Sequence, residues 1–180
     1  MPHVRIRLHD WSNEANLAGL RDGKLQVALL VGQPKARDLR FEQLTRERPR
    51  LAVSPNHRFA GLRSVPLAEA VCEPFVVYDR EEFPDYLEHL MRLFAGVKGK
   101  PQVVEEHDGF ASLLPAIEAG TGVALVSESF SCLAGGRVKL LHLTPEPSPT
   151  ILGMAVLKGP LSPAVEQFWR CAKEAAAMKA

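Results

Sequence analysis

Ser12 and Asn13 are side chains that could bind a small anion, because both stand where a helix is predicted to begin. They are of the types that cap helices, and Glu14 follows them in the first turn. Unpaired backbone N–H groups and the helix dipole at such an N-terminus favour a negatively charged group. The alternative is that both residues only cap the helix.

A second group of candidates lies between a predicted buried strand and the first turns of the next helix. Arg80 could pair with a carboxylate through its planar guanidinium. Tyr86 offers an aromatic ring and a hydroxyl, Pro84 suits the start of the helix, and His89 lies one turn beyond Tyr86. The alternative is a loop with a solvated arginine and a half-buried tyrosine, and with His89 on the surface.

Gln33 and Phe110 complete the candidate ligand-binding residues. Gln33 follows a predicted buried strand, although a plain turn at Gly32-Gln33-Pro34 is the alternative. Phe110 opens a predicted helix directly after Asp108-Gly109, where Asp108 alternatively serves only as a cap. His57 is interpreted as structural.

Enzyme signatures do not occur in the sequence: it has no G-x-S-x-G, H-E-x-x-H or phosphate-loop pattern. The six histidines do not cluster at metal-ligand spacing. The pair Gly120-x-Gly122 follows a predicted helix and precedes a strand, the reverse of a dinucleotide-binding turn. We therefore expect no catalytic residue, no metal and no cofactor, with a site assembled from distant residues as the alternative.

The composition is that of an ordinary globular chain of 180 residues, with 46% hydrophobic and 24% charged residues. The formal charge of +1 gives no electrostatic attraction to nucleic acid or membrane. Three widely spaced cysteines indicate neither a disulfide framework nor a zinc site, which favours a reducing cytoplasm. No secretion signal is recognisable, and no apolar run approaches the ~20 residues of a membrane span.

Hydrophobic periodicity predicts an α/β chain. Val4, Ile6 and Leu8 alternate with polar residues, which predicts a strand. A helix after Ser12 and a buried strand over 25–31 would complete a parallel βαβ unit. The other expected strands are 39–44, 51–53, 74–78, 102–105, 122–126, 138–143 and 151–157, and the other expected helices are 66–71, 85–95, 110–119 and one opening at Ser162-Pro163 with Val165, Phe168, Trp169 and Ala172 on its buried side.

Two segments are interpreted as crossings between lobes: the charged stretch around Pro49 and the proline-rich connector 145–149. A solvated charged loop is the alternative for the first. The order of elements predicts a discontinuous lobe I of residues 1–46 and 148–180 and a lobe II of residues 47–147. Ligands of such folds bind in the crevice between lobes.

Several phrases resemble those of LysR-type transcription regulators. Residues 17–29 resemble their "L-x-x-G-x-L-D-V-A-I" segment, residues 51–60 their "L-x-x-V-x-P-x-x-H-P-L-A" segment, and residues 119–126 their "A-A-G-x-G-V-A-L-L-P" segment. Glu73-Pro74-Phe75-Val76 fits the strand between them. Gln26 stands where the family usually has Asp, and Ser127 where it has Pro. The resemblance covers nearly the whole chain.

This resemblance implies the C-terminal effector-binding domain, with a two-lobed periplasmic-binding-protein-like (type II) fold and a double crossover hinge. It implies a small-molecule effector, namely an organic acid or similar metabolite, and a homodimer through the helices after Ser12 and over 85–95. DNA would be bound only through a domain absent from this chain, and the first βα unit of the effector domain is also without a counterpart. The alternatives are a free-standing solute-binding protein, an enzyme on this fold, and a chain that keeps the fold but binds nothing.

Overall fold

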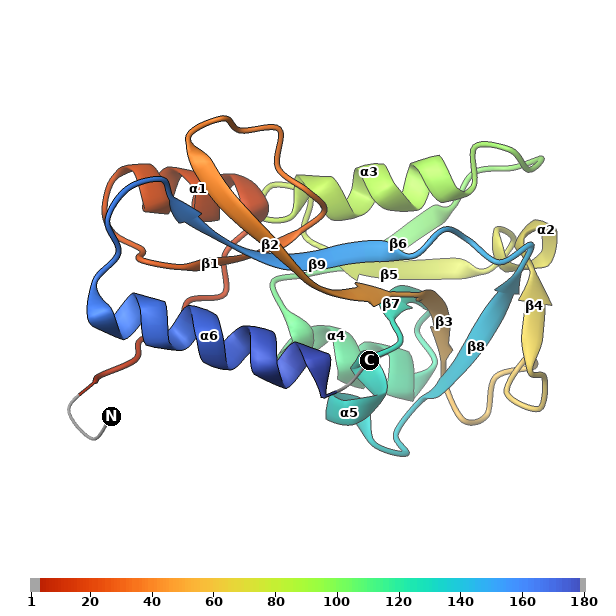
Figure 1. Ribbon diagram of the computed structural model, residues 1–180. Helices are drawn as coiled ribbons and strands as arrows, with labels where there is room; N and C mark the ends of the chain where they lie inside the picture. The colour runs from red at the N-terminus through yellow and green to blue at the C-terminus, as the bar shows by residue number, and fades with distance from the viewer. Residues whose placement is uncertain (1–3, 179–180) are drawn as a thin grey trace. The chain divides into compact units, whose positions relative to one another are not determined.

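The computed structural model describes residues 4–178, and its contacts divide the chain into two units. Unit 1 joins Met1–Arg46 to Thr150–Ala180, and unit 2 is Glu47–Pro149. The chain therefore passes from unit 1 to unit 2 once and returns once (Figure 1). The fold is the α/β, type II periplasmic-binding-protein-like fold that the family resemblance implied.

Unit 1 is built on a three-stranded sheet in the order β1-β9-β2. Its strands are β1 (Ala28–Val31), β9 (Thr150–Leu157) and β2 (Leu39–Glu47). The central strand, β9, runs antiparallel to β1, with Ala28 opposite Ala155. The last long segment of the chain thus supplies the middle of this sheet.

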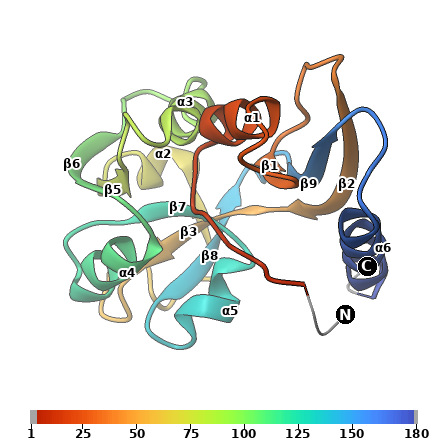
Figure 2. The same cartoon turned by 90° about the vertical axis from the view of Figure 1, so that its left-hand side faces the viewer.

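Two helices cover opposite faces of the unit 1 sheet, α1 (Asn13–Arg21) and α6 (Pro163–Ala177) (Figures 1 and 2). Side chains along β9 alternate between them, since Ala155 joins the cluster that contains Leu20 of α1. The residues on either side of Ala155 pack with Trp169 of α6 instead. This alternation follows from the period of two in a strand.

The expected strand over Val4–Leu8 is wrong: these residues form no strand, and all are exposed. The parallel βαβ unit is wrong with it, because β1 pairs antiparallel with β9. An alternating segment becomes a strand only when a neighbour takes its backbone groups, and the structure provides none for it.

Two further expectations for unit 1 need correction. The strand over 25–31 is shorter than expected and only half-buried, because β1 lies at the edge of the sheet and exposes Leu29 and Val31. Phe168, expected on the buried side of the last helix, is 40% exposed. Trp169 fills that side, with Val165 and Ala172 packed against its cluster.

Unit 2 contains a four-stranded sheet in the order β4-β8-β3-β7 and a parallel pair of β5 and β6. The strands are β3 (Pro49–Val53), β4 (Ser64–Pro66), β5 (Pro74–Tyr78), β6 (Gln102–His107), β7 (Ala124–Ser127) and β8 (Lys139–Thr144). The helices are α2 (Leu67–Ala70), α3 (Pro84–Leu93), α4 (Phe110–Ala119) and α5 (Phe130–Ala134). β4 and α5 were not predicted, because three and five residues are too short to show a period.

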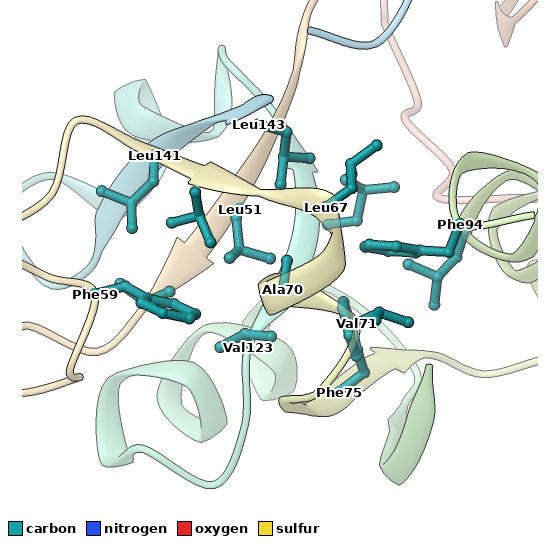
Figure 3. Packing of buried hydrophobic residues seen from close by; sticks show 14 of the residues in the cluster. Leu51, Phe59, Leu67, Ala70, Val71, Phe75, Phe94, Val123, Leu141 and Leu143 are labelled. Atoms are coloured by element: carbon teal, nitrogen blue, oxygen red, sulfur yellow. The ribbon is translucent and has the colours of Figure 1, made fainter. Parts of the chain in front are cut away.

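Two apolar clusters hold unit 2 together. The larger one contains Phe75 of β5 and Phe94, whose rings pack edge to face at 5.6 Å (Figure 3). The second contains Val76 and the inner residues Leu113 and Ile117 of α4. Adjacent residues of β5 therefore serve different clusters, which fixes this strand between α3 and α4.

A buried arginine joins the segments by which the chain enters and leaves unit 2. Arg50 is 7% exposed, and its guanidinium donates to Glu128 Oε2 (3.1 Å) and Glu146 Oε1 (3.4 Å). Arg48 also donates to Glu146 Oε1, at 3.4 Å. Because both arginines share one carboxylate, the two crossing segments are bound to each other.

No helix within residues 4–178 combines the length and the apolar character that a bilayer crossing requires.

Candidate functional site

Three parallel strands of unit 2 end close together. Tyr78 at the end of β5 lies opposite His107 at the end of β6, and Asp79 N donates to His107 O at 2.8 Å. Val123, the residue directly before β7, forms a parallel bridge with Phe75 of β5. A helix begins shortly after each strand, so we call residues 79–83, 108–109 and 127–129 the carboxyl edge. Ligands of α/β proteins bind at this end of parallel strands.

Aromatic rings gather along the carboxyl edge. Tyr78 contacts Phe83 and Tyr86, with ring centroids 5.3 and 5.1 Å apart. Phe110, the first residue of α4, packs edge to face on Phe130, the first residue of α5, at 5.0 Å. Phe130 is buried, whereas the other four rings are half-buried and give the edge apolar surface beside polar backbone, which is typical of small-molecule sites.

The N-terminus of α4 is open at the carboxyl edge. Gly109 precedes the helix and has no side chain with which to cap it. The neighbouring Asp108 carboxylate instead accepts from Ser112 Oγ at 2.6 Å. The first-turn N–H groups of α4 therefore have no side-chain cap, and they favour an anion through the helix dipole.

Ser127 and Ser129 add hydroxyl groups to the same edge. Their Oγ atoms are 2.9 Å apart, and Ser129 N donates to Glu47 Oε2 at 3.2 Å. In the sequence, Ser127 stands out only as a departure from a family pattern. Its place directly after a predicted apolar strand was the available signal.

Arg80 is paired with Glu106 within the chain. Arg80 Nε donates to both Glu106 oxygens, at 2.9 and 3.1 Å, and Nη2 donates to Oε1. These hydrogen bonds hold the pKa of the Glu106 carboxyl below its usual value. A cavity of about 440 Å³ beside the pair is lined by four carboxylates and one arginine: Asp79, Glu81, Glu105, Glu106 and Arg80, with Val103 and Val104. That lining disfavours a carboxylate ligand.

Among residues 4–178, no three His, Cys, Asp or Glu side chains are grouped so that they could hold a metal ion.

Residues 1–177 match the family described as the LysR substrate binding domain. The chain belongs to this family. BenM, a transcriptional regulator of Acinetobacter baylyi, is 25% identical over 132 residues, which are 71% of this chain and 43% of BenM. CatR of Pseudomonas putida is 22% identical over 91% of this chain and 56% of its own length. The chain thus spans about half the length of these relatives.

Solved effector-binding domains of the LysR family share this fold. The BenM domain with benzoate superposes with a TM-score of 0.81 at 20% identity, over 99% of this chain and 81% of that one. The QuiR domain in complex with shikimate gives a TM-score of 0.75 at 18% identity, over 93% and 79%. At such identities the likeness establishes the fold alone.

Four of the predicted site residues belong either to the carboxyl edge or to α3. Pro84 is the first residue of α3, as expected, and Arg80 belongs to the carboxyl edge. Tyr86 Oη donates to Leu125 O at 3.0 Å, so this hydroxyl already has a partner. His89 is half-buried, and burial lowers the pKa of its imidazole, which favours the neutral form. Their contacts with a ligand stay predictions.

The other predicted residues divide between the units. Phe110 lies at the open end of α4 in unit 2. In unit 1, Ser12 caps α1 by accepting from Ala15 N (3.3 Å), and Gln33 is exposed after β1. The Asn13 side-chain amide donates to Val31 O and accepts from Val31 N. Ligand contacts of these residues also stay predictions.

Replacing Tyr86 with phenylalanine tests the structural role of its hydroxyl. Loss of the hydrogen bond to Leu125 is expected to lower the free energy of unfolding by about 1 kcal/mol at neutral pH. Burial raises the pKa of the Tyr86 phenol far above its usual range. The unfolded chain ionises this group near pH 10, so Tyr86 lowers stability as pH rises beyond that value, by up to about 1.4 kcal/mol per pH unit.

Urea unfolding of wild type and Tyr86→Phe between pH 7 and 11 measures both effects. The difference between the two proteins should shrink above pH 10, because only the wild type carries the buried phenol. A difference that stays constant with pH would contradict the burial of this hydroxyl.

Proposed function

We propose that this chain is the ligand-sensing domain of a LysR-type transcription regulator, and that unit 2 binds the carboxylate of a small organic acid at the carboxyl edge. The uncapped N-terminus of α4, beside the ring pair Phe110–Phe130, is the observation that carries this proposal. The first-turn N–H groups of α4 would donate to the carboxylate. The half-buried Phe110 ring, which packs on Phe130, would contact the apolar part of the same ligand.

The ligands of two similar proteins support an organic acid. Benzoate is the effector in the BenM domain structure, and shikimate is bound in the QuiR domain structure. Both compounds carry a carboxylate on a six-membered ring. A carboxylate and a ring are the two groups that an uncapped helix N-terminus and an aromatic pair suit.

A sensing role requires that the ligand prefer one conformation of the chain. The ligand shifts the population of conformations only as far as its affinity for them differs. In a complete regulator, a separate domain would bind DNA, the effector domains would pair as a homodimer, and the protein would act in the cytoplasm. For this role the chain needs a binding site and no catalytic residue.

A thermal-shift screen with benzoate, shikimate and related acids tests the proposal. A ligand at 100 times its Kd adds about 2.7 kcal/mol to the native state. For a chain of this length, the unfolding midpoint should rise by about 5–10 °C. A cooperative transition that no acid shifts would contradict ligand sensing and favour a chain that keeps the fold without a ligand.

Gly109→Asp locates the site. Its backbone is extended and a Cβ there would meet nothing within 4 Å, so aspartate fits and caps α4 with its own carboxylate. We expect it to weaken acid binding at least about tenfold by occupying the N–H groups and repelling the anion. Gly61→Asp adds the same charge in open space elsewhere in unit 2 and should leave affinity unchanged. Equal affinities of both variants would place the site elsewhere.

A further inference from the structure

Unit 1 exposes more large apolar side chains than unit 2, although it is the smaller unit. Eight of the twelve exposed large hydrophobic residues among the described ones belong to it. Five of these eight lie in only two places, the segment Val4–Leu8 and the strand β1. Clustered exposure of this kind is typical of interaction surfaces.

β1 is an edge strand with an apolar row on one face. Within residues 4–178 it pairs only with β9, on one of its two sides. Leu29 and Val31 are 53% and 58% exposed, whereas Ala28 and Leu30, which alternate with them, are buried. The strand therefore offers both a free edge and an uncovered apolar surface to a further strand.

Side-chain amides of α1 occupy the backbone groups of this edge. Asn13 Nδ2 donates to Val31 O (2.7 Å), and Val31 N donates to Asn13 Oδ1 (3.0 Å). Asn16 Nδ2 donates to Leu29 O at 3.3 Å. Donating to and accepting from one residue is what a neighbouring strand does. The backbone groups of this edge are thus bound by two half-buried side chains, which an added strand could replace.

The segment Val4–Leu8 has the complementary property. Its apolar residues alternate with Arg5 and Arg7, as in a strand with one apolar face. Ile6 and Leu8 are 64% and 90% exposed, and the segment belongs to no strand of the described chain. Unit 1 therefore contains a strand-forming segment without a sheet and a sheet edge without a strand.

We propose that Val4–Leu8 of one copy of this chain adds to the edge of β1 in a second copy and displaces Asn13 and Asn16. Its apolar residues would then extend the row of Leu29 and Val31. Within one chain the segment leads directly into α1, whose side chains occupy the edge, so we assign the pairing to two copies. This proposal does not depend on the proposed function.

Sedimentation of single variants measures the pairing. Ile6→Lys should raise the Kd of the dimer at least about tenfold, whereas Leu133→Lys, at an exposed residue of unit 2, should not change it. Asn13→Ala frees the edge and should lower the Kd several-fold relative to Glu14→Ala, its neighbour in α1. A wild-type chain that stays monomeric at millimolar concentration, or a dimer indifferent to Ile6→Lys, would overturn the proposal.

Cross-linking locates the contact. Cys72, Cys132 and Cys171 are exposed, so serine can replace them in a background variant. Ile6→Cys and Leu29→Cys are placed in separate chains of different mass, mixed and oxidised, and the mixed disulfide dimer is the expected product. A disulfide within one chain carrying both changes at high dilution would overturn the proposal. So would preferential coupling of Ile6→Cys to Val104→Cys on β6, the exposed outer strand of unit 2.

Discussion

Gly153→Ala is expected to destabilise unit 1 by about 3 kcal/mol. Gly153 lies in the central strand of the unit 1 sheet, and a Cβ there would overlap the Phe41 ring and stand 2.6 Å from Glu42 O. Glu42 belongs to β2, so its carbonyl cannot move away without disturbing the pairing of β2 with β9. The substitution therefore separates strands of the sheet, because moving a flexible side chain would not relieve the overlap with the backbone.

Hydrogen exchange resolves this effect by unit. Amides of β1 and β9 should lose most of their protection in Gly153→Ala, and the sheet of unit 2 should lose less. Gly96→Ala is the matched change, since a Cβ at Gly96 meets nothing within 4 Å. A Gly153→Ala protein as stable as Gly96→Ala would mean that Phe41 does not pack over this glycine.

Phe75→Ala is expected to lower the free energy of unfolding of unit 2 by about 3–5 kcal/mol, the usual cost of emptying a buried phenylalanine site. Phe75 is fully buried on β5 and packs against Phe94, the residue that ends α3. It also takes part in the bridge that joins β5 to β7. The cavity would lie beneath β5, the strand that leads into the carboxyl edge, so acid binding should weaken together with stability.

Urea unfolding followed by hydrogen exchange measures the loss. Phe168→Ala removes the same side chain from a 40% exposed position on α6 and should cost less than about 1 kcal/mol. Similar losses for the two variants would contradict the burial of Phe75.

Segments whose pattern depends on local sequence were predicted well. The strand over 74–78 and the helix over 110–119 have the predicted bounds, because an apolar run and a glycine-terminated helix are visible in the sequence alone. The alternation of Val4, Ile6 and Leu8 is equally regular, yet it forms no strand. Periodicity reports which side chains could share a face, whereas pairing depends on residues far along the chain.

The same distinction applies to the candidate site. Arg80 was identified because it follows a strand, and Phe110 because it opens a helix. The partner of Arg80 is Glu106, 26 residues away, and only the register of β5 with β6 brings them together. Asn13 was interpreted as a cap or ligand contact, because its partner Val31 is 18 residues distant. Long-range partners of polar side chains are thus what sequence patterns leave out.

Unit 2 is inserted between the two segments of unit 1, and the carboxylate of Glu146 holds its two ends together. Arg48 stands one residue after unit 2 begins and Glu146 three residues before it ends, and they are hydrogen-bonded. A domain whose termini lie together can be excised, transplanted or circularly permuted without stretching its host. We therefore expect that residues 47–149 can be exchanged between members of this family as one segment. The hydrogen bonds from Arg48 and Arg50 to Glu146 lie within this segment and would be transferred with it.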